Sequence, residues 1–286
     1  MRFRERVTTA TAQWFHQQWQ QGRVGAIAPI ATPNAATVQA YLAQECQRLQ
    51  AAGYGGAIAP LKRNTWYSYR CIVESNARPL FWQEPDLPDY WCGALAQQGF
   101  TPIAYYHSAE CTDLGIVDPR YSELRDRFTQ NGIRLRAVNL QTPTIELEKI
   151  YRVAIAAFAK NFCFTPIPFG EFHQLYEPLL PRLNPEMVLL AAAGETIIGF
   201  ALGIPDLRAS SKQTVILKTV AVLTQRRYGG LGRWLVAAFH NRAAKQGYQR
   251  IIHALMHDAN FSCNLSRRYA TQTFRRYALW GKVFGH

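Results

Sequence analysis

The chain has 286 residues, 48% of them hydrophobic, and its 32 Lys and Arg against 19 Asp and Glu give a formal net charge of +13. This length allows two domains of ordinary size or one large domain, and the apolar fraction excludes a disordered or fibrous protein. The six cysteines are scattered, with no C-x-x-C pair and no Cys/His cluster at zinc spacing. This pattern favours free thiols in a reducing compartment over disulfides or a metal site.

Neither export nor membrane insertion is indicated. The N-terminal stretch begins basic but continues through polar residues in place of an apolar core, so no signal peptide is predicted. The most apolar stretch, 187–204, is interrupted by Gly194-Glu195-Thr196 and predicts two strands joined by a tight turn. We expect a soluble, cytoplasmic protein without a membrane span. The sequence leaves the oligomeric state open.

The positive charge is concentrated in the second half. Between Arg208 and His286 there are 14 basic residues and one acid, Asp258. Such a field attracts a polyanion, which makes coenzyme A, nucleic acid or an acidic surface the possible partners. The alternative is a basic face that is simply solvated.

The first half of the chain contains a predicted strand followed by a helix. Residues 24–30 form an apolar strand. Thr32 as N-cap and Pro33 at the first helical position predict a helix that runs to about Ala52, with Gly53 just beyond its end. A polar connector, 117–132, separates this half from the next.

The second half gives a more complete succession of elements. We expect, in order, a strand at 133–140, helices at 144–160 and 169–180, strands at 187–193, 196–204 and 214–223, a helix at 231–246 and a strand at 250–255. The helix at 231–246 has an apolar face, and Gly247 follows it as a typical C-terminal glycine. Its flanking strands predict a parallel crossover.

The two halves resemble each other. A shift of 194 positions places Gly53 on Gly247 and Ile58 on Ile252, which favours an internal duplication. We therefore expect an α/β (α+β) protein of two domains, each with a mixed, largely antiparallel sheet flanked by helices. The predicted boundaries are 1–118 for the first domain, 119–132 for a linker and 133–286 for the second domain.

A glycine-rich turn joins the strand at 214–223 to the helix at 231–246. It reads Arg227-Tyr228-Gly229-Gly230-Leu231-Gly232. A diphosphate needs several backbone N–H groups that converge at a helix N-terminus, where the helix dipole favours negative charge and side chains would obstruct the approach. The turn therefore predicts a phosphate site. The alternative is an ordinary strand–helix turn that contains glycine.

This segment resembles the cofactor-binding core of the GNAT acyltransferases over about 133–286, and 20–115 resembles the family more loosely. The resemblance implies that acetyl-CoA, or another acyl-CoA, lies beside a splayed strand with its pyrophosphate on the glycine loop. The implied cofactor-binding residues are Val220, Val222, Arg227, Gly229, Gly230, Leu231, Gly232, Arg233, Asn260 and Ser262. In the first half, Pro33, Ala36 and Val38 occupy the positions of Arg227, Gly230 and Gly232. We therefore expect the first half not to bind coenzyme A.

The resemblance also implies direct acyl transfer to an amine, with a tyrosine that protonates the leaving thiolate. The position where many members have this tyrosine is Arg267 here, so Tyr269 is the candidate acid and a structural aromatic residue is the alternative. Lys218 stands where many members have a glutamate, and the general base is not identified. Lys218 is predicted to bind the acceptor or a phosphate, or else to reach solvent from a strand edge.

The acceptor is expected at the break between the first two helices of the second half. The resemblance implies contacts from Asn161, Phe164 and Thr165, and the acceptor is a small-molecule or peptide amine. His253 and His257 are four apart but no acid completes a metal site, so we expect no metal. The main prediction is an acyl-CoA N-acyltransferase. The alternatives are a non-catalytic coenzyme A-binding or sensor protein, an aminoacyl or hydroxyl acyltransferase, and, least favoured, a nucleic-acid-binding protein.

Overall fold

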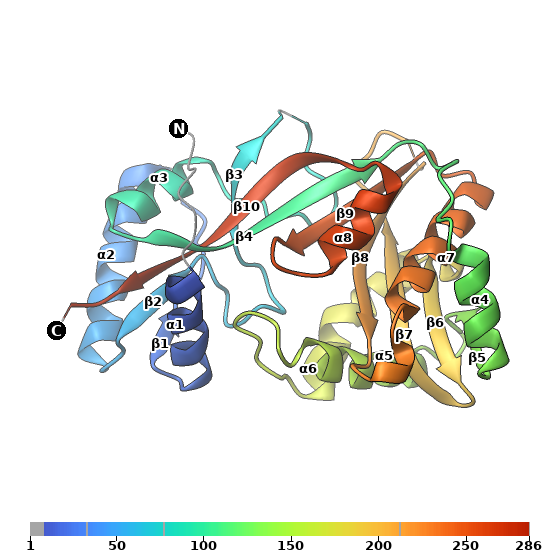
Figure 1. The fold of residues 1–286 in the computed structure, drawn as a ribbon. Helices are drawn as coiled ribbons and strands as arrows, with labels where there is room; N and C mark the ends of the chain where they lie inside the picture. The colour runs from blue at the N-terminus through green and yellow to red at the C-terminus, as the bar shows by residue number, and fades with distance from the viewer. Residues whose placement is uncertain (1–8, 33, 77, 212, 286) are drawn as a thin grey trace. The chain divides into compact units, whose positions relative to one another are not determined.

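The structure is a computed structural model that describes residues 9–32, 34–76, 78–211 and 213–285. Its packing divides the chain into two units, each described here by itself. Unit 1 comprises Met1–His107, Asn161–Thr165 and Phe274–His286, and unit 2 comprises Ser108–Lys160 and Pro166–Thr273. Figure 1 gives the positions of the helices and strands along the chain.

Unit 1 contains the strand–helix–strand arrangement expected in the first half. Strand β1 (Val24–Ala26) and strand β2 (Gly56–Ala59) are parallel, and helix α2 (Ala35–Ala51) connects them. The helix begins later than predicted. Its N-cap is Asn34, not Thr32, because the Asn34 side chain accepts a hydrogen bond from the Thr37 amide at 3.0 Å. Pro33, predicted at the first helical position, lies outside the described residues.

Unit 1 has further helices and strands and contains an apolar core. It contains α1 (Thr9–Gln20), β3 (Cys71–Ser75) and α3 (Tyr90–Gln97), together with parts of β4 (Thr101–Cys111) and β10 (Gln272–Val283). The strand order is β1-β2-β10-β4, and β10 is antiparallel to β2 and β3. Buried residues of α2 and α3 pack against Ala278 and Trp280 of β10.

Unit 2 is built on the strand order β4-β9-β8-β7-β6-β5. Its further elements are α4 (Tyr121–Gln130), β5 (Ile133–Ala137), α5 (Pro143–Phe158), α6 (Phe169–Tyr176), β6 (Val188–Ala193), β7 (Thr196–Pro205), β8 (Thr214–Val222), α7 (Leu231–Lys245), β9 (Arg250–His257) and α8 (Ser262–Ser266). The pairs from β5 to β8 are antiparallel, whereas β8 and β9 are parallel. The predicted mixed sheet flanked by helices is confirmed.

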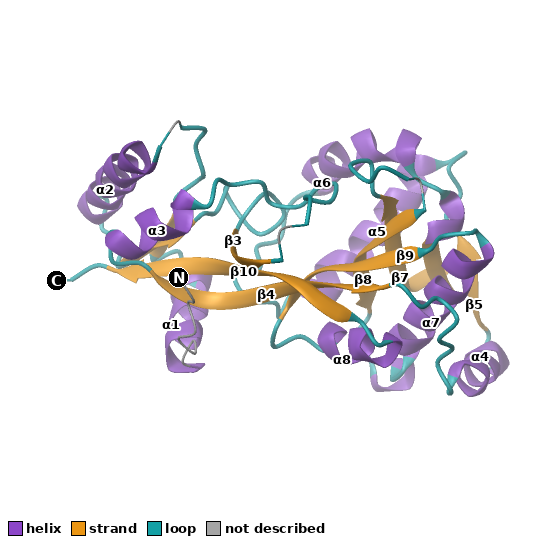
Figure 2. Cartoon of the chain, turned by 90° about the horizontal axis from the view of Figure 1, so that it is seen from above, coloured by secondary structure: helices purple, strands orange, loops and turns teal. Residues whose placement is uncertain are grey.

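Helices cover both faces of this sheet. Leu189 and Ala201 pack with the apolar face of α7, whereas Val188 and Leu202, their neighbours along the strands, line an apolar pocket with residues of α5. This alternation is the period-two pattern of strands buried on both sides. Figure 2 shows α7 and α4 on one side of the strands and α5 on the other. Helix α6 ends at Tyr176, short of the predicted 180, and a 3-10 turn follows at Glu177–Arg182, because Pro178 and Pro181 lack an amide hydrogen.

The two units are built from interleaved segments of the chain. Strand β4 follows α3 in the first half, yet its residues from Ser108 onward belong to unit 2. Strand β10 follows α8 in the second half, yet its residues from Phe274 onward belong to unit 1. The halves therefore exchange their closing strands. Two consecutive domains are not confirmed, and the boundaries 1–118, 119–132 and 133–286 stay a prediction.

The segment expected to be a linker contains a helix. Helix α4 has a polar composition, but Leu124 and Phe128, four positions apart, are both buried. The ring of Phe128 stacks on Trp234 of α7 with centroids 5.4 Å apart and planes 13° apart. Two apolar side chains on one face are enough to pack a short helix against a neighbouring helix. An apolar face of only two residues is easily missed in the sequence.

Candidate cofactor site

The glycine-rich turn adopts the geometry of an anion-binding helix start. It leaves β8 at Val222 and passes through a 3-10 turn at Arg226–Tyr228. Gly230 then takes the left-handed conformation, with φ 88°, immediately before α7. The first helical hydrogen bond runs from the Trp234 amide to the Gly230 carbonyl at 3.1 Å. The amides that precede Trp234 in the first turn have no acceptor within the helix, and the dipole adds partial positive charge there.

The glycines of the loop differ in their physical role. A Cβ on Gly230 would lie 3.1 Å from Arg127 Nη2 and 3.2 Å from Leu124 Cδ2, and the positive φ disfavours any other residue. A Cβ on Gly232 would meet its nearest neighbours, on Leu265 and Val222, only at 3.8 Å. Gly230 is therefore required by the backbone and by α4. Gly232 is not required by the packing of the protein, because the space beside it, between β8 and α8, would take a Cβ at ordinary van der Waals distance.

Strands β8 and β9 separate beside the loop. Their registered pairs run from Thr214 and Arg250 to Leu217 and His253, although β8 continues to Val222 and β9 to His257. On its other side β8 stays paired with β7 as far as Val222, with a register shift between Leu202 and Gly203, opposite Lys218. The predicted residues Val220 and Val222 therefore lie in the part of β8 beyond its registered pairing with β9. A strand edge of this kind offers backbone donors and acceptors to an extended ligand.

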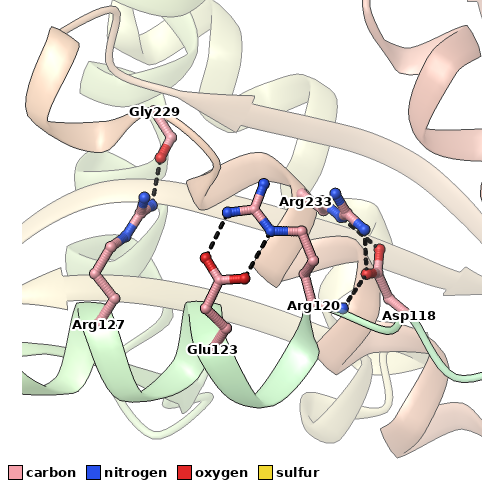
Figure 3. A network of polar contacts seen from close by, with 6 residues as sticks. All are labelled: Asp118, Arg120, Glu123, Arg127, Gly229 and Arg233. Carbon is pink, nitrogen blue, oxygen red and sulfur yellow. Dashed lines mark hydrogen bonds and ion pairs between the residues drawn. The ribbon is translucent and has the colours of Figure 1, made fainter.

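The arginines near the loop have different environments. Arg226 and Arg227 are exposed, and the Arg227 Nε donates to Gln225 Oε1 at 2.9 Å. Arg233, by contrast, makes a two-pronged ion pair with Asp118, with Nε–Oδ2 at 2.7 Å and Nη2–Oδ1 at 2.6 Å (Figure 3). Its guanidinium thus already has an anionic partner within the protein, whereas Arg226 and Arg227 face solvent.

The segment after β9 contributes to the same region. Asn260 is exposed and its carbonyl accepts from the Cys263 amide, while Ser262 is half-buried at the start of α8. Leu265 of α8 is one of the two nearest neighbours of the space beside Gly232. The structure thus brings α8 to the start of α7, as the predicted cofactor set requires. The roles of Asn260 and Ser262 stay predictions.

Tyr269 lies inside unit 2, in contact with two histidines. It is 1% exposed, and its ring stacks on His240 with centroids 3.6 Å apart. His240 Nε2 and His253 Nε2 lie 2.9 Å apart. Among the described residues, the Tyr269 hydroxyl and His240 Nδ1 are buried and have no hydrogen-bond partner. Buried polar groups are rarely left unpaired, so these two atoms mark a place where a further group is expected.

Burial sets the protonation states of this cluster. It raises the pKa of Tyr269 and lowers the pKa of His253 to about 4. Burial, reinforced by His253, lowers the pKa of His240 to about 2. Both histidines are therefore neutral at pH 7, and the tyrosine keeps its proton. Sequence reasoning missed His240, which lies on the side of α7 opposite Leu231 and Ala238; spacing alone had suggested His253 with His257.

The predicted acceptor residues fall into both units. Asn161, Phe164 and Thr165 belong to unit 1, and Lys218 lies in β8 of unit 2. The loop is well anchored within unit 1. Trp19 Nε1 donates to Thr165 Oγ1 at 3.0 Å, and Trp66 Nε1 donates to the Thr165 carbonyl at 2.8 Å. That these residues bind an acceptor stays a prediction, and the anchoring tryptophans were not foreseen.

The described part of the chain contains no group of three or more His, Cys, Asp or Glu residues arranged to hold a metal ion. None of the helices in that part has the length and apolar character needed to cross a membrane.

The structure is that of an α+β protein in which a glycine-rich helix start lies beside a pair of parallel strands that separate. Residues 150–268 match the Acetyltransferase (GNAT) family. This match covers less than half of the chain; enzymes of the matched family typically use an acyl-CoA co-substrate. Among curated proteins, none matches this chain in sequence.

Several solved structures are similar in fold. A GCN5-related N-acetyltransferase from Sphaerobacter thermophilus shares 18% identity with a TM-score of 0.50, over 68% of this chain and 56% of that one. A glucosamine N-acetyltransferase region of a fungal multi-domain β-N-acetylglucosaminidase shares 13% identity with a TM-score of 0.53, over 85% and 27%. A tandem GNAT protein of clavulanic acid biosynthesis shares 11% identity with a TM-score of 0.49, over 87% and 70%. The chain thus spans about half of the first of these proteins and about a quarter of the second.

Proposed function

We propose that this protein transfers an acetyl or other short acyl group from acyl-CoA to an amine. The observation that carries the proposal is the glycine-rich start of α7, where Gly230 has a positive φ and a Cβ on Gly232 would fit, beside the part of β8 that extends beyond its registered pairing with β9. The diphosphate of the co-substrate would bind the free amides of the first helical turn, and its pantetheine arm would follow Val220 and Val222. Arg226 and Arg227 supply positive charge for the phosphates.

In the proposed reaction the neutral amine nitrogen attacks the thioester carbonyl carbon. The C–S bond then breaks, the nitrogen releases one proton to solvent as the amide forms, and the leaving sulfur accepts one proton from a donor that solvent re-protonates. Tyr269 is the proposed donor of that proton, supported by its buried hydroxyl, which has no hydrogen-bond partner among the described residues. Asn161, Phe164, Thr165 and Lys218 are the proposed acceptor contacts.

The principal alternative is a protein that binds coenzyme A without turnover. Lys218 and Thr219 at the point where β8 and β9 separate favour it, because neither supplies a carboxylate base there. A hydroxyl or an aminoacyl group as acceptor is a further variant of the enzyme.

Two measurements separate these functions. Calorimetric titration with acetyl-CoA tests binding, and thiol release in the presence of a panel of amines, alcohols and aminoacyl compounds tests transfer. Binding with transfer to an amine supports the proposal. Binding with no acceptor-dependent thiol release supports the sensor, and the absence of binding contradicts both.

A further inference from the structure

We infer that Asp118 and helix α4, which precede the segment that matches the family, position the glycine loop for the cofactor diphosphate. This inference rests on the proposed function. Asp118, Leu124, Arg127 and Phe128 are positioning residues in this view, and Arg233 connects the loop to them instead of binding phosphate itself.

The first contact is made by Arg127 of α4. Its Nη2 donates to the Gly229 carbonyl, 102 positions away in sequence, at 2.5 Å (Figure 3). The same nitrogen lies beside Gly230, together with Leu124. A donor to the Gly229 carbonyl fixes the orientation of the Gly229–Gly230 peptide, and with it the direction in which the Gly230 amide points. Arg127 therefore acts on the backbone group that the diphosphate needs.

The second contact is the ion pair between Asp118 and Arg233. The Asp118 side chain is fully buried, and Arg233 is 13% exposed at its side chain. Asp118 also accepts from the Arg120 amide at 2.9 Å. Burial acts to raise the pKa of Asp118, but the hydrogen bonds from Arg233 and Arg120 outweigh it, so the pKa lies below its usual value and the carboxylate is ionised. Because Arg233 is the third residue of α7, this ion pair holds the first helical turn in place.

The third contact is apolar. Phe128 stacks on Trp234, the residue whose amide makes the first hydrogen bond of α7. Three successive parts of the loop, at Gly229–Gly230, Arg233 and Trp234, are thus held by residues 118–128. Preorganised amides bind an anion more tightly than mobile ones, because the cost of ordering them has already been met in folding.

The test uses Arg127→Gln and Asp118→Asn, with Glu123→Gln as the matched control. Glu123 lies on the same helix, but its ion pair with Arg120 is exposed on both sides. The probes are acetyl-CoA and S-acetylpantetheine, which carries the same thioester but no diphosphate. Binding is measured by titration, and thermal unfolding is recorded for each variant.

We expect the Kd for acetyl-CoA to rise at least about tenfold in Arg127→Gln and Asp118→Asn, as for the loss of one charge-assisted contact. The Kd for S-acetylpantetheine and both affinities of Glu123→Gln should stay unchanged, and Arg127→Lys should restore part of the acetyl-CoA affinity. Parallel losses for both probes would indicate general destabilisation and overturn the inference, as would unchanged acetyl-CoA affinity. A wild-type protein that does not bind acetyl-CoA would overturn the proposed function as well.

Discussion

The rings of His240 and Tyr269 are stacked, with centroids 3.6 Å and planes 16° apart. Helix α7 supplies His240, and the 3-10 turn after α8 supplies Tyr269. The stack fixes the tyrosine ring through its faces and leaves the hydroxyl oxygen without a protein partner among the described residues. An aromatic residue that only filled the core would not need that oxygen, whereas a proton donor would.

The first prediction concerns this hydroxyl. Tyr269→Phe should lower turnover about 10²-fold, the lower end of what a general acid contributes, with little change in the affinity for acyl-CoA. The stacked ring is kept, so the fold should be retained. Steady-state turnover and direct cofactor binding measure the two effects.

Tyr277→Phe is the matched control, because the Tyr277 hydroxyl donates to Glu84 in unit 1. It should reduce thermal stability and leave turnover of the folded protein nearly unchanged. Full turnover of Tyr269→Phe would show that the hydroxyl is not the acid.

The second prediction concerns stability at low pH. Burial lowers the pKa of His253 to about 4, and burial with His253 lowers that of His240 to about 2, while an unfolded histidine titrates near 6.5. As the pH falls below about 6.5 the unfolded chain takes up protons that the folded protein does not, so the folded state loses stability. Each histidine contributes up to about 1.4 kcal/mol per pH unit to this loss.

Urea unfolding at pH 7 and pH 5 measures the effect. The double variant His240→Phe with His253→Leu should lose less stability between these pH values than the wild type. If the double variant loses as much free energy of unfolding between pH 7 and pH 5 as the wild type does, groups other than the two histidines cause the loss of stability.

The third prediction separates the two loop glycines. Gly232→Ala should stabilise the free protein by about 0.5–1 kcal/mol, because Gly232 is helical and the added Cβ has room. It should weaken acetyl-CoA binding at least about tenfold, because the methyl group enters the space that the cofactor needs. Gly230→Ala should instead destabilise the protein, through its positive φ and its contact with Arg127.

Thermal unfolding without ligand measures the stability of each variant, and titration with acetyl-CoA measures its affinity. If Gly232→Ala binds acetyl-CoA as the wild type does, the space beside Gly232 is not the cofactor site.

The fourth prediction concerns truncation. A polypeptide of residues 133–286, the domain expected from the sequence, lacks all of β4 and all of α4. It therefore loses the hydrogen bond between the Leu255 amide and Ser108 Oγ, the Asp118–Arg233 ion pair and the stack on Trp234. We expect it to be insoluble or to bind no acetyl-CoA.

Co-expression with residues 1–132 should restore a soluble complex that binds the cofactor. A soluble fragment 133–286 that binds acetyl-CoA as the full chain does would contradict the exchange of closing strands described above.

The local elements and the loop of this protein follow from short-range signals in the sequence. The strand–helix–strand unit around α7 was predictable because apolar spacing, a glycine at each end of the helix and a long apolar strand are short-range signals. The weaker unit around α2 followed from the same rules, apart from its N-cap, where Asn34, and not Thr32, accepts the hydrogen bond from the Thr37 amide. The glycine loop could be recognised because the residues that form it are consecutive in the sequence.

The segments that hold the loop in place are set by contacts between residues that are far apart in the sequence. Asp118 lies 115 positions from Arg233, and Arg127 lies 102 positions from Gly229. In the sequence these charged residues resemble those of a solvent-exposed connector, because a charged side chain does not indicate which distant residue it will pair with. The exchange of β4 and β10 was hidden for a similar reason. A strand shows which of its faces is apolar but not which edge it pairs with, and that choice is made by the backbone hydrogen bonds of the folded chain.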